Sequence, residues 1–395
     1  MPIRIIPCED CEARTESLRK KGVKVHGCTP SATLAGMCEL SFDSLDEGSA
    51  PLAHATSFAA VLPPNVVAAA AAAAVPVAAD VALTDTQART AKSIVNLFET
   101  GHVLGDYGQV TVLKDDPGRL TYGRSQTTLT SGKLLELLQQ YAGNAGARFG
   151  AAITAWLPAI KAQGTDLDTN SRLHNLLRAC ADDPVMRETQ DRFFDIGFWQ
   201  PAVRKASTLG IRSALGTAVV YDSVVHGSWD LLRKKTDDPA VGGIGTIDQV
   251  GEQAWIGRYV TLRRTWLATH KIEILHSTVY RMDAFLRLID LNQWGLALPL
   301  VVRGAEISLT TLNGTPPGCY DGPVPGSRAL LAQEPLLRGL DVRLLQLALS
   351  NHGAAIKADG VYGAGSARCV RDEQLVRGLP VTGVADVALI GMLVG

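Results

Sequence analysis

The chain has little of what a membrane-spanning or nucleic-acid-binding protein needs. No run approaches the roughly 18–20 uninterrupted apolar residues of a spanning helix, and the Ala-rich tract 66–75 is short and flanked by prolines. The 38 Lys and Arg residues are balanced by 39 Asp and Glu, which gives a formal net charge of −1, and no long basic block appears. We therefore expect neither a membrane nor a nucleic acid among its partners.

The amino terminus lacks the features of a secretory signal peptide. Residues 1–8, MPIRIIPC, contain no apolar region of adequate length, and charged residues follow at once. A signal peptide needs such a region before its cleavage site. We therefore expect no classical signal, so that delivery outside the cytoplasm would use a dedicated secretion machine or cell lysis.

Cysteine is scarce outside the first 40 residues, which hold four of the seven. There the Cys8-x-x-Cys11 pair, with His26, Cys28 and Cys38, makes half of a zinc motif. Disulfides and free thiols are the alternatives. Because a second ligand pair is missing and the eight histidines are scattered, we expect no metal or cofactor in the mechanism. The other cysteines stand alone in the sequence: Cys180, Cys319 and Cys369.

Length and composition predict several domains. A chain of 395 residues has the length of two or three domains, and 46% hydrophobic residues suffice for their cores. Residues 1–40 form a small Cys-containing segment, and 41–83 an Ala/Pro-rich linker with too few large apolar side chains to offset its ordering entropy. We expect the largest domain over 84–310, a Pro/Gly-rich linker over 311–335 and a small domain over 336–395.

A helix with an acid at its end is predicted at the start of the largest domain. Thr84 or Asp85 is a plausible N-cap, and Gly101 ends the helix. Glu99 then lies at the helix C-terminus, where desolvation and the helix dipole favour the protonated carboxyl that a general acid needs. The helix is indicated by apolar residues near helical spacing: Ala88, Ala91, Ile94, Val95 and Phe98.

A β-hairpin with two more acids follows. Residues 110–113 and 120–122 read as strands, and Asp116-Pro117-Gly118 as the turn between them. At such a turn Asp115 and Asp116 stay solvated and ionised. One protonated acid facing one carboxylate is the arrangement that hydrolyses a glycosidic bond. Spacing alone also fits an ordinary helix end followed by an ordinary turn.

This region resembles known glycosidases. Glu99, Lys114-Asp115, Gly118, Thr121 and Gly123 are similar to the acid, hairpin carboxylate and threonine of phage-type lysozymes. With residues 122–126, YGRSQ, the segment is closer to the chitosanases of glycoside hydrolase family 46, and the resemblance extends over roughly 85–300. It implies a mainly α protein whose catalytic domain is lysozyme-like α+β, with a small β-hairpin at the cleft.

The resemblance also implies a mechanism. Glu99 would be the acid, and Thr121 would position the water that the base activates. Counting five residues back from Thr121, as in chitosanases, selects Asp116 as the base, whereas counting six back, as in phage lysozymes, selects Asp115; both stay open. Inversion of the anomeric carbon implies carboxyl groups about 6.5–9.5 Å apart.

Further residues follow from the same resemblance. The segment 218–227, AVVYDSVVHG, is similar to the family's central helix, which implies that Asp222 belongs to a charge network behind the acid. Segments 259–263 and 277–283 match its two arginine positions, Arg263 and Arg281, with Arg264 a close alternative to Arg263. We expect four residues near the hairpin to bind substrate: Tyr107, Tyr122, Arg124 and Gln126.

The carboxy-terminal 60 residues carry their own pattern. The elements DVxxLQxxL, DGxYG and GLxxTGxAD over residues 336–395 resemble the three-helix peptidoglycan-binding domain. The first predicts a helix with apolar Val342, Leu345 and Leu349 on one face.

Together these observations predict an endo-acting hydrolase of β-1,4 bonds in an amino-sugar polymer. Peptidoglycan is favoured by the terminal domain, by the missing signal and by Thr111-Val112-Leu113, which stand where chitosanases carry acids. Such a muramidase would be a lysin or an exported antibacterial effector, secreted or delivered to the periplasm or cell wall, with a secretion machine or an immunity protein as partner. Chitosan is the alternative substrate, and a non-catalytic wall-binding protein is the third hypothesis.

Overall fold

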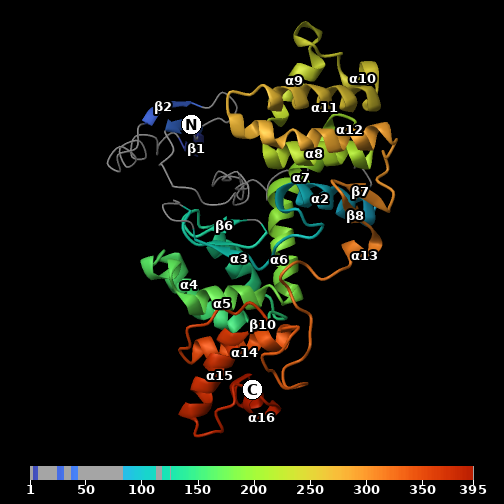
Figure 1. Ribbon diagram of the computed structural model, residues 1–395. Helices are drawn as coiled ribbons and strands as arrows, with labels where there is room; N and C mark the ends of the chain where they lie inside the picture. The colour runs from blue at the N-terminus through green and yellow to red at the C-terminus, as the bar shows by residue number, and fades with distance from the viewer. Residues whose placement is uncertain are drawn as a thin grey trace. The chain divides into compact units, whose positions relative to one another are not determined.

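The structure is a computed structural model that describes residues 3–7, 25–30, 37–42, 83–112, 118–124 and 126–394. From residue 83 onward these form two compact units (Figure 1). The first unit contains 83–99 and Pro201–Ile307, and the second contains Thr100–Gln200 and 308–394. None of the helices in the described part of the chain is both long and apolar enough to span a membrane.

The first unit is helical and is built around α8. This helix, Ala214–His226, is buried along residues 214–223, because its small and branched apolar side chains face neighbours on every side. It packs against α11, Glu252–Ala268, and α12, Tyr280–Asp290, which also pack on each other (Figure 1). The other elements are α7 Gln200–Thr208, α9 Trp229–Asp237, η6 Pro239–Val241, α10 Ile247–Val250, η7 Glu273–Thr278, β7 Leu300–Val302 and β8 Ala305–Ile307.

The predicted helix before the acid is confirmed as α2, Asp85–Thr100. Thr84 is its cap: Thr84 Oγ1 accepts a hydrogen bond from the Gln87 backbone N–H at 3.2 Å, and the Thr84 N–H donates to Gln87 Oε1 at 3.0 Å. Gly101 follows the helix at φ 76°, a left-handed conformation that suits glycine and ends the helix where it was expected.

The strand pairing of the predicted hairpin is confirmed in the second unit, whereas Asp116 and Pro117 of the predicted turn lie outside the described residues. Strand β4, Val110–Thr111, pairs antiparallel with β5, Thr121–Tyr122, in the register Thr111 opposite Thr121. A third strand that was not predicted, β6 Thr127–Thr128, pairs with the other edge of β5. The helices that complete this part are α3 Lys133–Ala142, α4 Gly150–Lys161, η4 Thr165–Asp168, α5 Ser171–Cys180, α6 Pro184–Phe194 and the π-helical turn η5 Asp195–Trp199.

The carboxy-terminal part of the second unit has the three helices that were predicted. They are α14 Leu340–Asn351, α15 Ala364–Val376 and α16 Val387–Val394, preceded by α13 Leu309–Leu312 and accompanied by the strand pair β9 Leu337–Arg338 and β10 Val361–Tyr362. Val342, Leu345 and Leu349 are buried in their common core, as the apolar periodicity indicated. The mainly α fold class is therefore confirmed.

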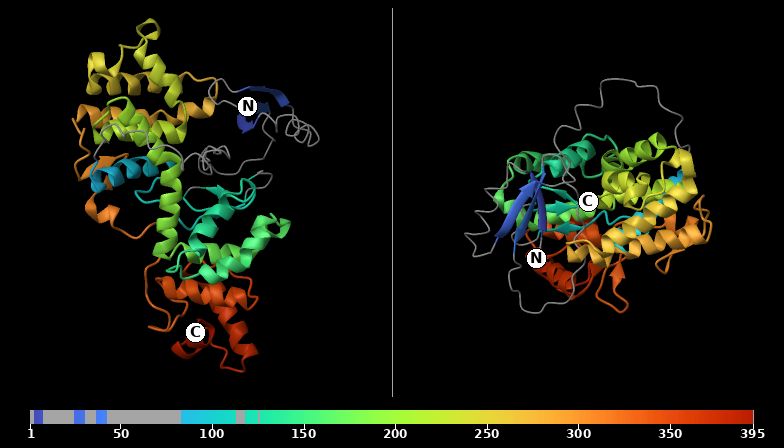
Figure 2. Two further views of the ribbon diagram at one scale, coloured as in Figure 1. Left: turned by 180° about the vertical axis from the view of Figure 1, so that it is seen from behind. Right: turned by 90° about the horizontal axis from the view of Figure 1, so that it is seen from above.

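Of these terminal helices, α14 packs directly on α5 of the same unit (Figures 1 and 2). Asn175 on α5 is buried, and its Nδ2 donates to Ser350 Oγ at 2.9 Å and to the Ile356 carbonyl at 2.8 Å. Its Oδ1 accepts from the Ala358 N–H at 2.8 Å. Because an unpaired buried amide is costly, this satisfied side chain fastens residues 350–358 to α5.

Candidate active site

Glu99 lies in the last turn of α2, with its side chain 22% exposed. Arg281 of α12 reaches it, with Nη2 at 2.8 Å from Glu99 Oε1. The neighbouring residue is held as well, because the Tyr280 hydroxyl donates to the Phe98 carbonyl at 2.7 Å. Two contacts from α12 therefore fix the end of α2. The salt bridge also places a positive charge beside the Glu99 carboxyl, which the prediction from its position at the helix C-terminus did not include.

Behind Glu99 the structure brings Arg281, Asp222 and Arg263 together. Asp222 Oδ1 accepts hydrogen bonds from Arg281 Nε at 2.9 Å and Nη2 at 2.6 Å, and Asp222 Oδ2 accepts one from Arg263 Nη1. Asp222 and Arg263 are completely buried and Arg281 nearly so. Burial alone would raise the pKa of Asp222, but Arg281 and Arg263 lower it to about 2. The result is a row of alternating charges from Glu99 to Arg263.

The structure distinguishes Arg263 from its neighbour Arg264. On α11 the two side chains point to different surroundings, and Arg264 is 43% exposed and pairs with Asp283. Only Arg263 lies within reach of Asp222. Burial on the side of α11 that faces α8 therefore selects Arg263 for the network.

Two further residues complete the network and were missed from the sequence. His226 Nδ1 lies 3.2 Å from Arg263 Nη2, and Arg263 Nε donates to Ser228 Oγ at 3.2 Å. Burial, Arg281 and Arg263 lower the pKa of His226 to about 3, so the ring is neutral and its Nδ1 accepts from the guanidinium. The sequence position of His226 could have indicated this contact, because it follows Asp222 by four residues and both therefore lie on one face of α8.

The hairpin carboxylates Asp115 and Asp116 lie outside the described residues, so the choice of base and the expected carboxyl separation stay predictions. Thr121 is described: it lies in the middle strand, is 7% exposed, and its Oγ1 donates to the Arg119 carbonyl at 3.2 Å. Arg119 itself is anchored to η4, with Nε at 2.7 Å from Asp168 Oδ2. The strand that returns from the turn is therefore firmly attached to its unit.

The four residues predicted to bind substrate have different surroundings. Tyr107 is buried and donates to Asp191 Oδ1 at 2.7 Å, and Arg124 pairs with the same carboxylate. Tyr122 is fully buried in the core of the second unit, and Gln126 is half-buried with Nε2 donating to the Gly123 carbonyl at 2.9 Å. Substrate binding stays a prediction for all four, and burial does not favour it for Tyr122.

The predicted cysteine site lies largely outside the described residues. Cys8 and Cys11 are among the residues not described, and of His26, Cys28 and Cys38 only the backbone is described. These last three lie on β2 Val25–Pro30 and β3 Met37–Phe42, which pair antiparallel with each other, and β1 Ile3–Pro7 pairs with the other edge of β3. Within the part of the chain that the structure describes, no three His, Cys, Asp or Glu side chains cluster to hold a metal. Three buried free thiols are described: Cys180, Cys319 and Cys369.

Two family models match the sequence. Glycosyl hydrolase family 46 matches residues 93–300, just over half of the chain, and a peptidoglycan binding domain matches 338–393. Among known proteins, a chitosanase of Bacillus subtilis (strain 168) is 28% identical over 239 residues, covering 57% of this chain and 84% of that protein.

Solved chitosanase structures are similar as well. A mutant chitosanase from Bacillus subtilis MY002 in complex with six GlcN units is 26% identical and covers 56% of this chain and 95% of its own, with a TM-score of 0.44. A family 46 chitosanase from Gynuella sunshinyii in complex with chitotetraose is 23% identical and covers 58% and 99%, with a TM-score of 0.43.

Arg263→Ala is expected to destabilise the protein much more than Arg264→Ala. The first change leaves the buried Asp222 carboxylate with one arginine fewer, which costs about 3–5 kcal/mol of the free energy of unfolding. The second removes an exposed ion pair and should change little. Urea unfolding of both variants measures the difference, and equal losses would contradict the assignment of Arg263 to the network.

His226 is expected to lower the free energy of unfolding in acid. The pKa of His226 is about 3 in the folded chain against an ordinary histidine pKa of 6.5, so the unfolded chain binds more protons between these two pH values. Stability should therefore fall as pH drops from about 6.5 toward 3. His226→Gln keeps a neutral acceptor for Arg263 and should make the free energy of unfolding depend less on pH in this range. Urea unfolding of wild type and variant at several pH values measures this, and the same pH dependence in both would contradict the role of His226.

Proposed function

Because this chain belongs to glycosyl hydrolase family 46, we propose that it cleaves β-1,4 bonds inside an amino-sugar polymer, with Glu99 as the general acid and inversion at the anomeric carbon. The observation that carries this proposal is the Glu99 carboxyl at a helix end, held by Arg281, which is in turn held by buried Asp222. An acid that protonates a leaving oxygen must keep its position during the reaction, and this network supplies that constraint.

The roles of the chain's groups follow from inversion. Arg281 contacts Oε1 of Glu99, so the proton given to the leaving oxygen would be carried on Oε2. Asp115 or Asp116 would take a proton from water on the opposite face of the sugar ring, and Thr121 would orient that water. Asp222 and Arg263 touch no substrate in this scheme and act as positioning residues.

Peptidoglycan is the proposed polymer. The carboxy-terminal domain that matches a peptidoglycan binding family is packed onto α5 of the unit that carries the hairpin. Thr111 and Val112 of the hairpin also carry no negative charge for a polycationic substrate. Chitosan is the second candidate, and the relatives support it at least as strongly, since those named above are chitosanases.

Glu99→Gln is expected to lower hydrolysis by at least about 100-fold, since the amide cannot donate the proton. The measurement is mass spectrometry of products from purified peptidoglycan and, in parallel, from chitosan. Glu306→Gln, an exposed change in β8, is the matched control and should retain activity.

The products decide between the candidates. Muropeptides with new reducing ends that require Glu99 support the muramidase, and glucosamine oligomers from chitosan alone support the chitosanase. A folded wild-type protein that yields neither product and still sediments with cell walls would contradict both in favour of a wall-binding protein.

A further inference from the structure

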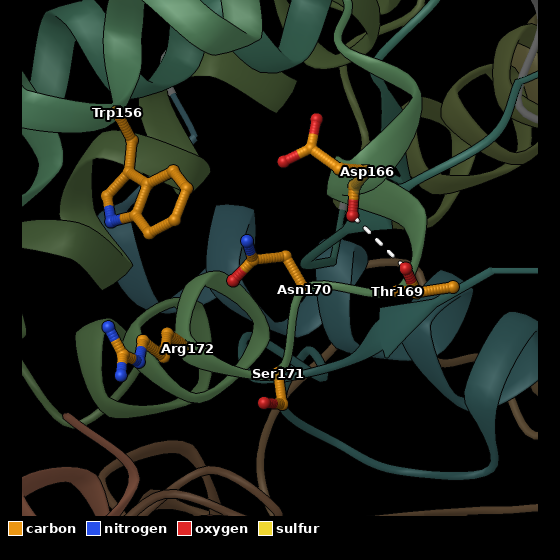
Figure 3. A pocket seen from close by; sticks show the side chains of 6 residues that line it. All are labelled: Trp156, Asp166, Thr169, Asn170, Ser171 and Arg172. Carbon is orange, nitrogen blue, oxygen red and sulfur yellow. Dashed lines mark hydrogen bonds between the residues drawn. The ribbon is translucent and has the colours of Figure 1, made fainter. Parts of the chain in front are cut away.

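A hollow lies on the second unit where α4, η4 and the start of α5 meet (Figure 3). Its volume is about 460 Å³, within the range of roughly 300–1,000 Å³ that small-molecule sites occupy. It is open to solvent and contains none of the residues assigned to catalysis. Its lining residues are Trp156, Asp166, Thr169, Asn170, Ser171 and Arg172.

Trp156 forms the apolar wall of the hollow. Part of its side chain packs against the hydrophobic core of the second unit, which holds the ring in place, and the rest is exposed. Figure 3 shows the indole ring beside the open space, with the Asp166 and Asn170 side chains on the other side of that space. A rigid, half-exposed aromatic ring suits the C–H face of a sugar, which is apolar although the ring edge carries hydroxyl groups.

Polar groups occupy the opposite side. The Asn170 side chain caps α5, with Oδ1 accepting from the Leu173 N–H at 3.1 Å, so the direction of its Nδ2 donor is set. The Asp166 carboxylate and the Asn170 amide point into the space in front of Trp156 (Figure 3). The Asn170 donor, the Asp166 carboxylate and the Ser171 hydroxyl fit the edge of a hydroxylated ring, whereas the Thr169 hydroxyl donates to the Asp166 carbonyl at 3.3 Å. The carboxylate is suited to a nitrogen substituent, either an ammonium or an amide N–H.

The hollow borders the carboxy-terminal domain. Gly353, in the loop after α14, lies next to Arg172: a Cβ atom built on this glycine would be 3.9 Å from Arg172 Nη2. One turn along α5 from Arg172, Asn175 is buried against residues 350–358 of that domain. One helix therefore lines the hollow with its first residues and holds the domain with its next turn. A glycan chain bound in the hollow would therefore lie at a fixed distance from the domain that matches the peptidoglycan-binding family.

From this arrangement we propose that the hollow is a second, non-catalytic sugar-binding site, which takes a segment of a β-1,4-linked amino-sugar chain. The identity of the polymer rests on the proposed function. The site holds the polymer through a ring stacked on Trp156 and a nitrogen substituent paired with Asp166, so that one glycan chain is bound away from the bond being cleaved.

The test uses the full chain with Glu99→Gln, labelled with 5-fluorotryptophan, which gives a separate fluorine resonance for each of the six tryptophans. The Trp156 resonance is assigned by its loss in Trp156→Phe. Titration with the glucosamine hexamer and the N-acetylglucosamine hexamer should shift this resonance in a saturable way. Trp266, half-buried in the first unit, is the matched control and should not follow the same titration curve.

Asp166→Ala and Arg172→Ala change exposed side chains, so folding should be retained, and Asp166→Ala should weaken the Trp156 response about tenfold. A response to the glucosamine hexamer assigns chitosan-type chains, and a response to the N-acetylated hexamer assigns wall-type or chitin-type chains. No saturable shift with either hexamer, or an unchanged Trp156 response in Asp166→Ala, would overturn the proposal. Hydrolysis by the wild type is measured separately: its absence with the Trp156 response intact contradicts the proposed function and leaves this site standing.

Discussion

The buried pairing of Arg281 with Asp222 is the interaction on which the rest of the candidate site depends. A guanidinium that is almost wholly removed from water needs a compensating charge, and Asp222 supplies it through two hydrogen bonds from one side. The same guanidinium reaches Glu99 on the other side. Because Asp222 comes from α8, Arg281 from α12 and Glu99 from α2, the position of the proposed acid is set by the packing of three helices.

The network also has a defined end. Arg263 balances the second oxygen of Asp222, and its other partners among the described residues are neutral acceptors: Ser228, the ring of His226 and the Met282 sulfur. A protonated His226 would face two guanidinium groups, and this repulsion, with burial, keeps its pKa low. The charges therefore alternate along the row, and each buried ion has an opposite neighbour. Such an arrangement is stable only as a whole, so loss of one member affects the others.

The sequence predicted the local elements better than their surroundings. Helical periodicity and Gly101 placed Glu99 at a helix end, and turn chemistry placed the hairpin, because both are encoded within a few residues. The choice between Arg263 and Arg264 depended on which side of α11 is buried, which neighbouring positions do not reveal. The contact of Asn175 with Ser350 joins residues 175 positions apart. A polar residue on α5 gave no sign that it contacts the terminal domain, so the sequence placed that domain after a linker without showing what it packs against.

The central claim is that Asp222 acts on catalysis through Arg281 by positioning Glu99. The direct measurement is the kinetics of Asp222→Asn on the polymer that the wild type cleaves, after circular dichroism has shown that the variant is folded. The account predicts that kcat falls about 100-fold, as expected for a displaced acid, while KM stays within about twofold, since Asp222 touches no substrate. A folded variant with wild-type kcat would contradict it.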